Sequence, residues 1–342
     1  MRFFVISITI NNDSNNQTLR NMHDTGRDVA LSEVIGFVLL LALVVSALSL
    51  YMIYVVPLQG REAEIIQMNR INEQFTDYKF TLDNIRTSML INNLSPVMTS
   101  TSLYLGTGGG NMEAGGFFMY LVKPRSSSAT LSVNATGDQF NIDSSSYHGS
   151  PSNAGEFPLN VTALEYSSDN NYWIQQRYSY QLGGVFLYQL DGVTNRVAPL
   201  ISITNSSNKS VVVNIAPVNI VGGGQINGNG PARVDTRMRV LPKYNISTDP
   251  FIPNTWVNLS YTSADNATAS MWLTIFKDIV TREKLDSSAY TTGSGYNSGT
   301  KKMTAFINIT GSNPDPGWPD VSLYVQRTEF FVAFNNIASG VT

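Results

Sequence analysis

The sequence predicts an α+β protein: a long N-terminal membrane-spanning helix, then a β-rich globular domain with one short helix packed on it. Three patterns predict this fold class. They are an uncharged apolar run near the N-terminus, a helical apolar stripe directly after it, and period-two alternation from residue 98 onward. Gly, Asn, Ser and Pro clusters separate the alternating runs, so we expect an antiparallel, sandwich-like arrangement of strands.

The apolar run covers residues 34–56, VIGFVLLLALVVSALSLYMIYVV, and contains no charge. As a helix it would be about 35 Å long, which exceeds the roughly 30 Å core of a bilayer. A cleaved secretory signal has a shorter apolar stretch that ends in small residues, whereas this one ends in YVVP. A retained single-span anchor is therefore favoured over a signal peptide and over a buried core helix. Two arginines precede the run, Arg20 and Arg27, and one, Arg61, closely follows it. This charge difference predicts that the N-terminus lies inside the cell and the large domain outside.

The helical pattern continues after Pro57, which we expect to kink the helix. Asn92 and Pro96 mark its end. Apolar residues recur between them at spacings of three and four: Ile65, Met68, Ile71, Phe75, Tyr78, Leu82, Ile85 and Met89. Two partners for this stripe stay open, the chain's own β domain and neighbouring subunits, and they are compatible on different faces.

The outer domain shows short candidate strands. They cover residues 102–105, 117–122, 129–134, 159–166, 172–182, 185–190, 200–204, 210–221, 232–241, 256–262, 303–310 and 322–334. Pro217 indicates an edge or a bulge within one of them. One helix is predicted around residues 272–280, where apolar residues follow a helical spacing, with Asp265 or Ser263 as its N-cap.

Composition excludes several functions. Charged residues make up only 14% of the chain and the net charge is −3, so no basic excess exists for nucleic acid. Cys is absent and His occurs twice, which removes thiolate chemistry and most metal sites. The Gly-rich stretch 222–230 lacks the Lys-Ser/Thr of a phosphate-binding loop, and residues 167–171 indicate a hairpin turn more than a calcium site. We therefore expect no enzyme, no cofactor and no metal.

Residues 26–37, GRDVALSEVIGF, carry a resemblance. A short polar leader runs into Ser32, Val34, Ile35 and Gly36 at the start of the apolar helix. This segment resembles the class III (prepilin-type) signal of archaeal type IV pilin-like proteins. The resemblance implies that a membrane-bound prepilin peptidase cuts between Asp28 and Val29, which makes Glu33 the fifth mature residue. Residues 178–192, YSYQLGGVFLYQLDG, are also similar to large pilin-like archaeal envelope proteins.

The resemblance implies a division of the chain into a leader 1–28, a helix 29–95 and an extracellular β-rich domain 96–342. Starting at Met22 would shorten the leader to MHDTGRD, so residues 1–21 are expected to reflect an upstream start. Glu33 is expected to act in assembly, where it can neutralise the α-amine of a neighbouring subunit in an apolar core.

The implied function is that of a minor pilin or pseudopilin at the cell surface or in a pilus, with a role in adhesion. Its partners would be the membrane, the prepilin peptidase, an assembly ATPase with its membrane platform, and other pilin subunits. The alternative is a membrane-anchored envelope glycoprotein or adhesin that does not polymerise. Candidate N-glycosylation sites follow from the sequons, at Asn134, Asn160, Asn205, Asn208, Asn245, Asn258, Asn266 and Asn308.

Overall fold

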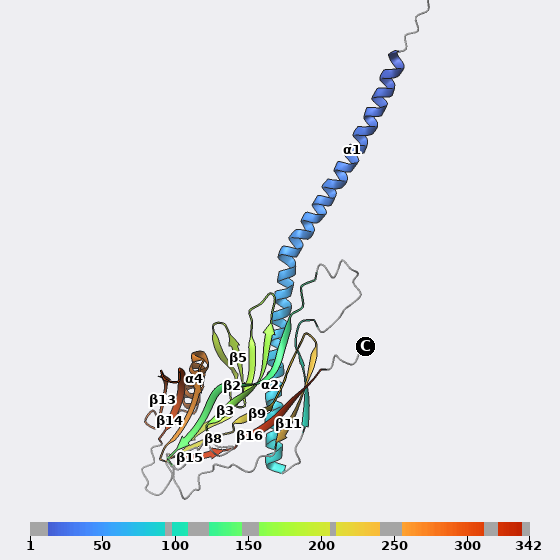
Figure 1. Cartoon of the computed structure of the whole chain (residues 1–342). Helices are drawn as coiled ribbons and strands as arrows, with labels where there is room; N and C mark the ends of the chain where they lie inside the picture. The colour runs from blue at the N-terminus through green and yellow to red at the C-terminus, as the bar shows by residue number, and fades with distance from the viewer. Residues whose placement is uncertain are drawn as a thin grey trace, which may run out of the picture. The chain divides into compact units, whose positions relative to one another are not determined.

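The structure is a computed structural model, which describes residues 13–92, 98–108, 123–145, 157–205, 210–239, 255–310 and 321–336 (Figure 1). It confirms the α+β class, with a long apolar N-terminal helix and a large domain of mostly antiparallel sheets. The described residues up to 59 belong to one compact unit, and those from 60 onward, apart from 123–124, belong to a second.

Residues 13–59 of the first unit are helical, and the last of these helices extends into the second unit. Helix α1 (Asp13–Leu50) runs into a π-helical turn, η1 (Tyr51–Val55), and the chain continues as α2 (Val56–Asn92). In the π-turn the backbone N–H of Val56 bonds to the carbonyl of Tyr51, five residues back. Pro57 has no backbone N–H to donate to the helix, and the π-helical turn ends two residues before it. The irregular turn therefore lies next to the position where the sequence predicts a kink. Apolar side chains of residues 34–54 are exposed on this segment, and its length and composition make it a candidate membrane span.

Three sheets form most of the second unit in the described residues. The largest has the order β13-β14-β12-β2-β3-β4-β5-β6, with β10 paired to β2; the others are β1-β11-β16-β9 and β15-β8-β7. The pairs β15–β8 and β16–β9 are parallel and the remaining described pairs are antiparallel. The strands are β1 (Met98–Tyr104), β2 (Ser128–Ser144), β3 (Leu159–Asp169), β4 (Arg177–Gln181), β5 (Gly184–Gln189), β6 (Gly192–Val197), β7 (Ile201–Asn205), β8 (Val211–Ile215), β9 (Val218–Gly222), β10 (Gln225–Gly228), β11 (Pro231–Arg239), β12 (Val257–Ser263), β13 (Tyr290–Asn297), β14 (Lys302–Ile309), β15 (Val321–Val325) and β16 (Thr328–Asn336).

The apolar stripe of α2 packs on the chain's own β domain. Ile71, Phe75 and Leu82 are fully buried there, in one core with side chains of the largest sheet and of the sheet that contains β11. Tyr78 hydrogen-bonds through its hydroxyl to Thr236 Oγ1 of β11 at 2.9 Å. Of the two packings that the sequence leaves open, the structure therefore contains the one within the chain.

A second core surrounds another helix of this unit, α4 (Asn266–Arg282), which lies against β14 and its neighbours (Figure 1). Trp272 is fully buried at its centre and stacks on Tyr261, with ring centroids 4.6 Å apart. The helix confirms the predicted apolar spacing, and Asp265 is the N-cap, since its carboxylate accepts the backbone N–H groups of Ala267 and Thr268.

The strand predictions differ from the structure at identifiable points. The run 210–221 divides into β8 and β9 just before Pro217, and the run 322–334 divides into β15 and β16. The run 172–182 becomes a strand only from Arg177, because the residues before it form the turn of the β3–β4 hairpin. The predicted strand 117–122 lies outside the described residues. Three strands were not predicted, namely β6, β10 and β13.

Candidate functional site

A bulge in β2 creates a polar cleft in the largest sheet. The register of β2 against β3 shifts between Ala135 and Gln139, and Gly137 inside the bulge has φ +80°, a conformation that glycine adopts without strain. Asp138 follows this glycine and is buried, and its carboxylate accepts a hydrogen bond from the Tyr261 hydroxyl at 2.7 Å. The bulge therefore places an acid among polar neighbours below the surface.

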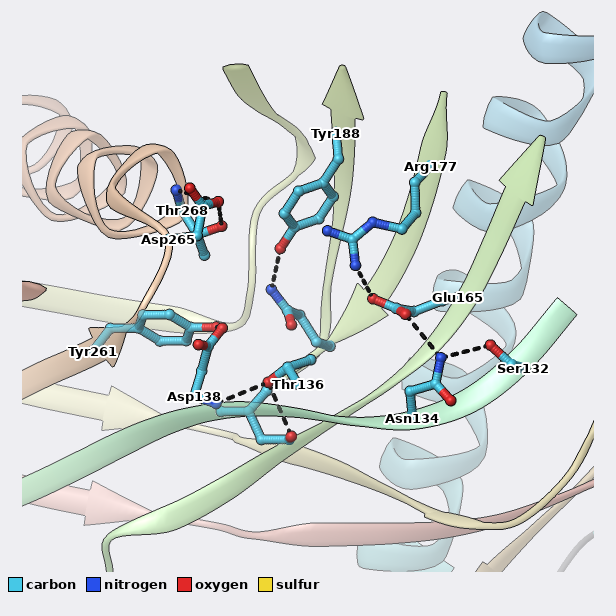
Figure 2. Close-up of polar contacts among 12 residues, drawn as sticks. Ser132, Asn134, Thr136, Asp138, Glu165, Arg177, Tyr188, Tyr261, Asp265 and Thr268 are labelled. Carbon is cyan, nitrogen blue, oxygen red and sulfur yellow. Dashed lines mark hydrogen bonds and ion pairs between the residues drawn. The ribbon is translucent and has the colours of Figure 1, made fainter. Parts of the chain in front are cut away.

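The cleft has a volume of about 420 Å³. Its walls come from the bulge, from β3, β4 and β5, and from the segment that joins β12 to α4 (Figure 2). The lining residues are Asn134, Ala135, Thr136, Asp138, Glu165, Arg177, Tyr188, Ser263, Ala264, Asp265 and Thr268. Most of them carry a hydroxyl, amide, carboxyl or guanidinium group, so the cleft offers many hydrogen-bonding atoms in a small space.

One wall is a chain of paired polar groups (Figure 2). Arg177 donates to Glu165 at 2.5 Å and lies over the Tyr188 ring, 3.9 Å from its centroid. Asn134 donates from its amide nitrogen both to the other Glu165 oxygen at 3.1 Å and to Ser132 Oγ at 2.8 Å. The buried carboxylate of Glu165 thus accepts hydrogen bonds from both an arginine and an amide. These paired groups hold each other in place, so this wall is rigid.

The opposite wall contains the start of α4. Asp265 there accepts Ala267 N–H and Thr268 N–H at 3.1 and 3.2 Å. Burial raises the pKa of Asp138, against the lowering effects of its hydrogen bonds with Tyr261 and Ser263 and of the Lys302 charge. Burial also raises the pKa of Tyr188, to about 12. The cleft thus combines the hydroxyl groups of Thr136, Tyr188 and Ser263 with carboxyl and guanidinium groups, which suit a polar ligand that both donates and accepts hydrogen bonds.

The residues predicted to act in processing and assembly lie on α1, away from this cleft in the sequence. Asp28 and Val29 fall within α1. This helix begins at Asp13, upstream of the predicted cleavage bond between Asp28 and Val29. Glu33 is exposed. The roles of these three residues in cleavage and assembly stay predictions.

The described sequons differ in environment. Asn160, Asn205 and Asn266 are exposed. Asn258 and Asn308 are half-buried cross-strand partners in the β12–β14 pair. Asn134 belongs to the cleft wall, and its amide nitrogen already donates twice. Asn208 and Asn245 lie outside the described residues.

Sequence reasoning did not find the cleft. Its residues come from segments as far apart as β2 and α4, and no short motif links them. The sequence contains one local indication of the cleft, the opposite charges of Glu165 and Arg177. These residues lie on the two strands of one hairpin, where Glu165 pairs with Ser179, two residues from Arg177 on the same strand. Comparisons of the chain with protein-family models, with curated proteins and with solved structures give no match.

Proposed function

We propose that this chain is a type IV pilin-like surface subunit, a minor pilin or pseudopilin, that a prepilin peptidase processes. The observation that carries the proposal is the continuity of the helix. The exposed apolar segment of residues 34–54 runs through η1 into α2, whose apolar stripe is buried in the core of the β domain. The candidate membrane span is in this way followed along the chain, without a break in the helix, by the segment that packs in the core of the large domain.

The resemblance of residues 26–37 supports the processing step. Cleavage between Asp28 and Val29 would make Val29 the new N-terminus, with a free α-amino group at the start of an otherwise uncharged helix. Glu33, exposed one turn further along, is the acid nearest to that amine in the mature chain. In a bundle of such helices the amine of one subunit and Glu33 of another would neutralise each other, which favours a defined stagger. Assembly would need an ATPase, a membrane platform and other pilin subunits.

The N-terminus of the protein recovered from cell envelopes tests the proposal, by mass spectrometry of its terminal peptide. A start at Val29 supports prepilin processing. A start at Met1 or Met22 refutes it. A Glu33→Gln variant separates processing from assembly: we expect an unchanged N-terminus and a loss of the protein from sheared surface filaments.

The second candidate is a membrane-anchored envelope glycoprotein or adhesin that does not polymerise. The polar cleft and the exposed sequons at Asn160, Asn205 and Asn266 favour it. Under this proposal the leader stays on the chain, the protein stays in the membrane fraction, and Glu33→Gln has no effect on its location. In both proposals the large domain is extracellular and nucleic acid is not a partner.

A further inference from the structure

A larger cavity lies elsewhere in the β domain. It has a volume of about 750 Å³ and opens among the last turns of α2 and α4, the β6–β7 connection and the sheet β15-β8-β7. Drug-sized ligands occupy cavities of about 300 to 1,000 Å³. Apolar side chains such as Val197, Leu200 and Ile279 form much of its wall. It shares no lining residue with the polar cleft described above.

Arg86 at the end of α2 is the notable polar group of this cavity. Its Nε is buried and has no hydrogen-bond partner among the described residues. The acid one turn before it, Asp83, forms its ion pair with Lys79 at 2.5 Å. A buried charged donor without an acceptor is costly, because its desolvation is not offset by a new hydrogen bond. Asp83 Oδ1 is likewise buried without a hydrogen-bond partner among the described residues. Because Nε is enclosed by protein, a ligand in the cavity can reach Arg86 only through its two Nη groups, and Arg86 forms no ion pair with a described Asp or Glu.

A second guanidinium lines the cavity from the last turn of α4. Arg282 is largely exposed, and its Nε lies 3.1 Å from Glu283. No Asp or Glu occurs among the described lining residues. Glu283 balances the charge of Arg282, so Arg86 is the cation that the described lining offers to an anion.

The sheet provides a polar row on one face. In register, Ser202 of β7 and Tyr324 of β15 both lie opposite Asn214 of β8, so the three side chains lie side by side. Asn214 and Tyr324 are exposed, and all three line the cavity. A ligand that fills the cavity therefore has to satisfy hydroxyl and amide groups as well as a guanidinium.

We propose that this cavity binds the carboxy-terminal end of a peptide whose last side chains are apolar. The terminal carboxylate would accept hydrogen bonds end-on from the two Nη groups of Arg86, a bidentate geometry that lysine cannot provide. The last apolar side chains would lie against Leu200 and Ile279. The peptide amides would pair with the row of Ser202, Asn214 and Tyr324. A fatty acid has the carboxylate and the apolar body but would leave that row without partners, so a peptide is the better fit.

Isothermal titration of the full-length protein in detergent tests the proposal, with acetyl-leucyl-leucine as the probe and its carboxamide as the matched ligand. We expect the free acid to bind at least tenfold more tightly than the amide. Arg86→Gln should abolish this difference, and Arg70→Gln, an exposed arginine about 24 Å earlier along the same helix, should preserve it. Equal binding of acid and amide, or no binding of either, would overturn the proposal.

Two further binding measurements distinguish a peptide end from a fatty acid. Decanoate tests the lipid alternative: if it binds as tightly as the dipeptide and with the same dependence on Arg86, the ligand is not a peptide end. Asn214→Ala should weaken the dipeptide severalfold and leave decanoate unchanged. Thermal unfolding of each variant checks the fold, and the comparison of acid with amide on the unmodified protein stands even if Arg86→Gln does not fold.

Discussion

Glu64 ties α2 to the β3–β4 hairpin, and its removal should loosen the large domain. Its side chain is 1% exposed. One carboxylate oxygen accepts the backbone N–H of Asn171 at 2.7 Å, and the other accepts the N–H groups of Tyr172 and Trp173 at 2.9 and 2.6 Å. Three consecutive donors of one turn thus converge on one buried acid, in the manner of an anion-binding nest.

The expected effect follows from these three contacts. Each hydrogen bond to a charged group contributes about 1.5 to 3 kcal/mol net, and the three are not additive, because one desolvated carboxylate serves all of them. Glu64→Gln keeps the shape but replaces one acceptor by an NH₂ group that faces donors. We expect it to lower the free energy of unfolding by about 2 to 4 kcal/mol, and Glu64→Ala by about 3 to 5 kcal/mol.

Urea unfolding of the purified full-length protein in detergent measures this effect through tryptophan fluorescence, because Trp173 lies in the affected turn. A loss of this size lowers the midpoint by about 1 M or more. Glu62→Gln is the matched control, since Glu62 lies on the same helix and is exposed; its midpoint should stay within experimental error. If the two variants have equal midpoints, Glu64 does not contribute as argued.

Three other substitutions test separate features of the β domain. In a solvent-exposed helix, replacing glycine by alanine stabilises by about 1 kcal/mol. At Gly60, however, the new Cβ would lie 2.3 Å from Tyr172 Cδ2, so we expect Gly60→Ala to lower the melting temperature. In the Tyr172→Ala background the same substitution should raise it. Asp138 has a raised pKa in the folded state, so its contribution to stability falls as the pH rises through the interval between its unfolded and folded values. As the pH rises from about 4 to about 7, the urea midpoint of Asp138→Asn should therefore increase relative to that of the unmodified protein. An equal difference between the two midpoints at both pH values would contradict the burial argument. Asp265→Ala should cost about 1 to 2 kcal/mol in urea unfolding through loss of the α4 cap, and Asp265→Asn should restore most of it.

Local patterns predicted the helices well, because the information for them lies within a few turns. The spacing of Trp272, Ile275 and Ile279 identified α4, and Asp265 precedes its first turn at the position of a cap. The strands that escaped prediction have sequences without enough apolar residues: β6 reads GVTNRV, β10 reads QING and β13 reads YTTGSGYN. They are strands because they pair with a neighbour, which no periodicity of their own indicates.

The polar sites were beyond prediction for a different reason. Glu64 is one of several charged residues on α2, and its partners are backbone N–H groups, which every sequence has. Asp138 reaches the cleft through a bulge whose only local signal is Gly137. In both cases the function of the side chain depends on a segment more than one hundred residues away, Trp173 in one and Tyr261 in the other.

The burial of the α2 stripe narrows the ways in which copies of this chain can associate. Phe75, Tyr78 and Leu82 are already buried in the core of their own domain, and exposing them would cost about 1.5 to 3 kcal/mol each. Contacts between copies along the helix must therefore use other side chains. Residues 34–54 offer one exposed apolar surface, and on α2 Ile66 and Phe80 are 54% and 53% exposed, fourteen positions apart and so on nearly the same face. Ile66→Asp and Phe80→Asp should leave the unfolding midpoint nearly unchanged. If the proposed filament forms and takes up these variants as well as the unmodified protein, the proposed association of subunits does not use this face of α2.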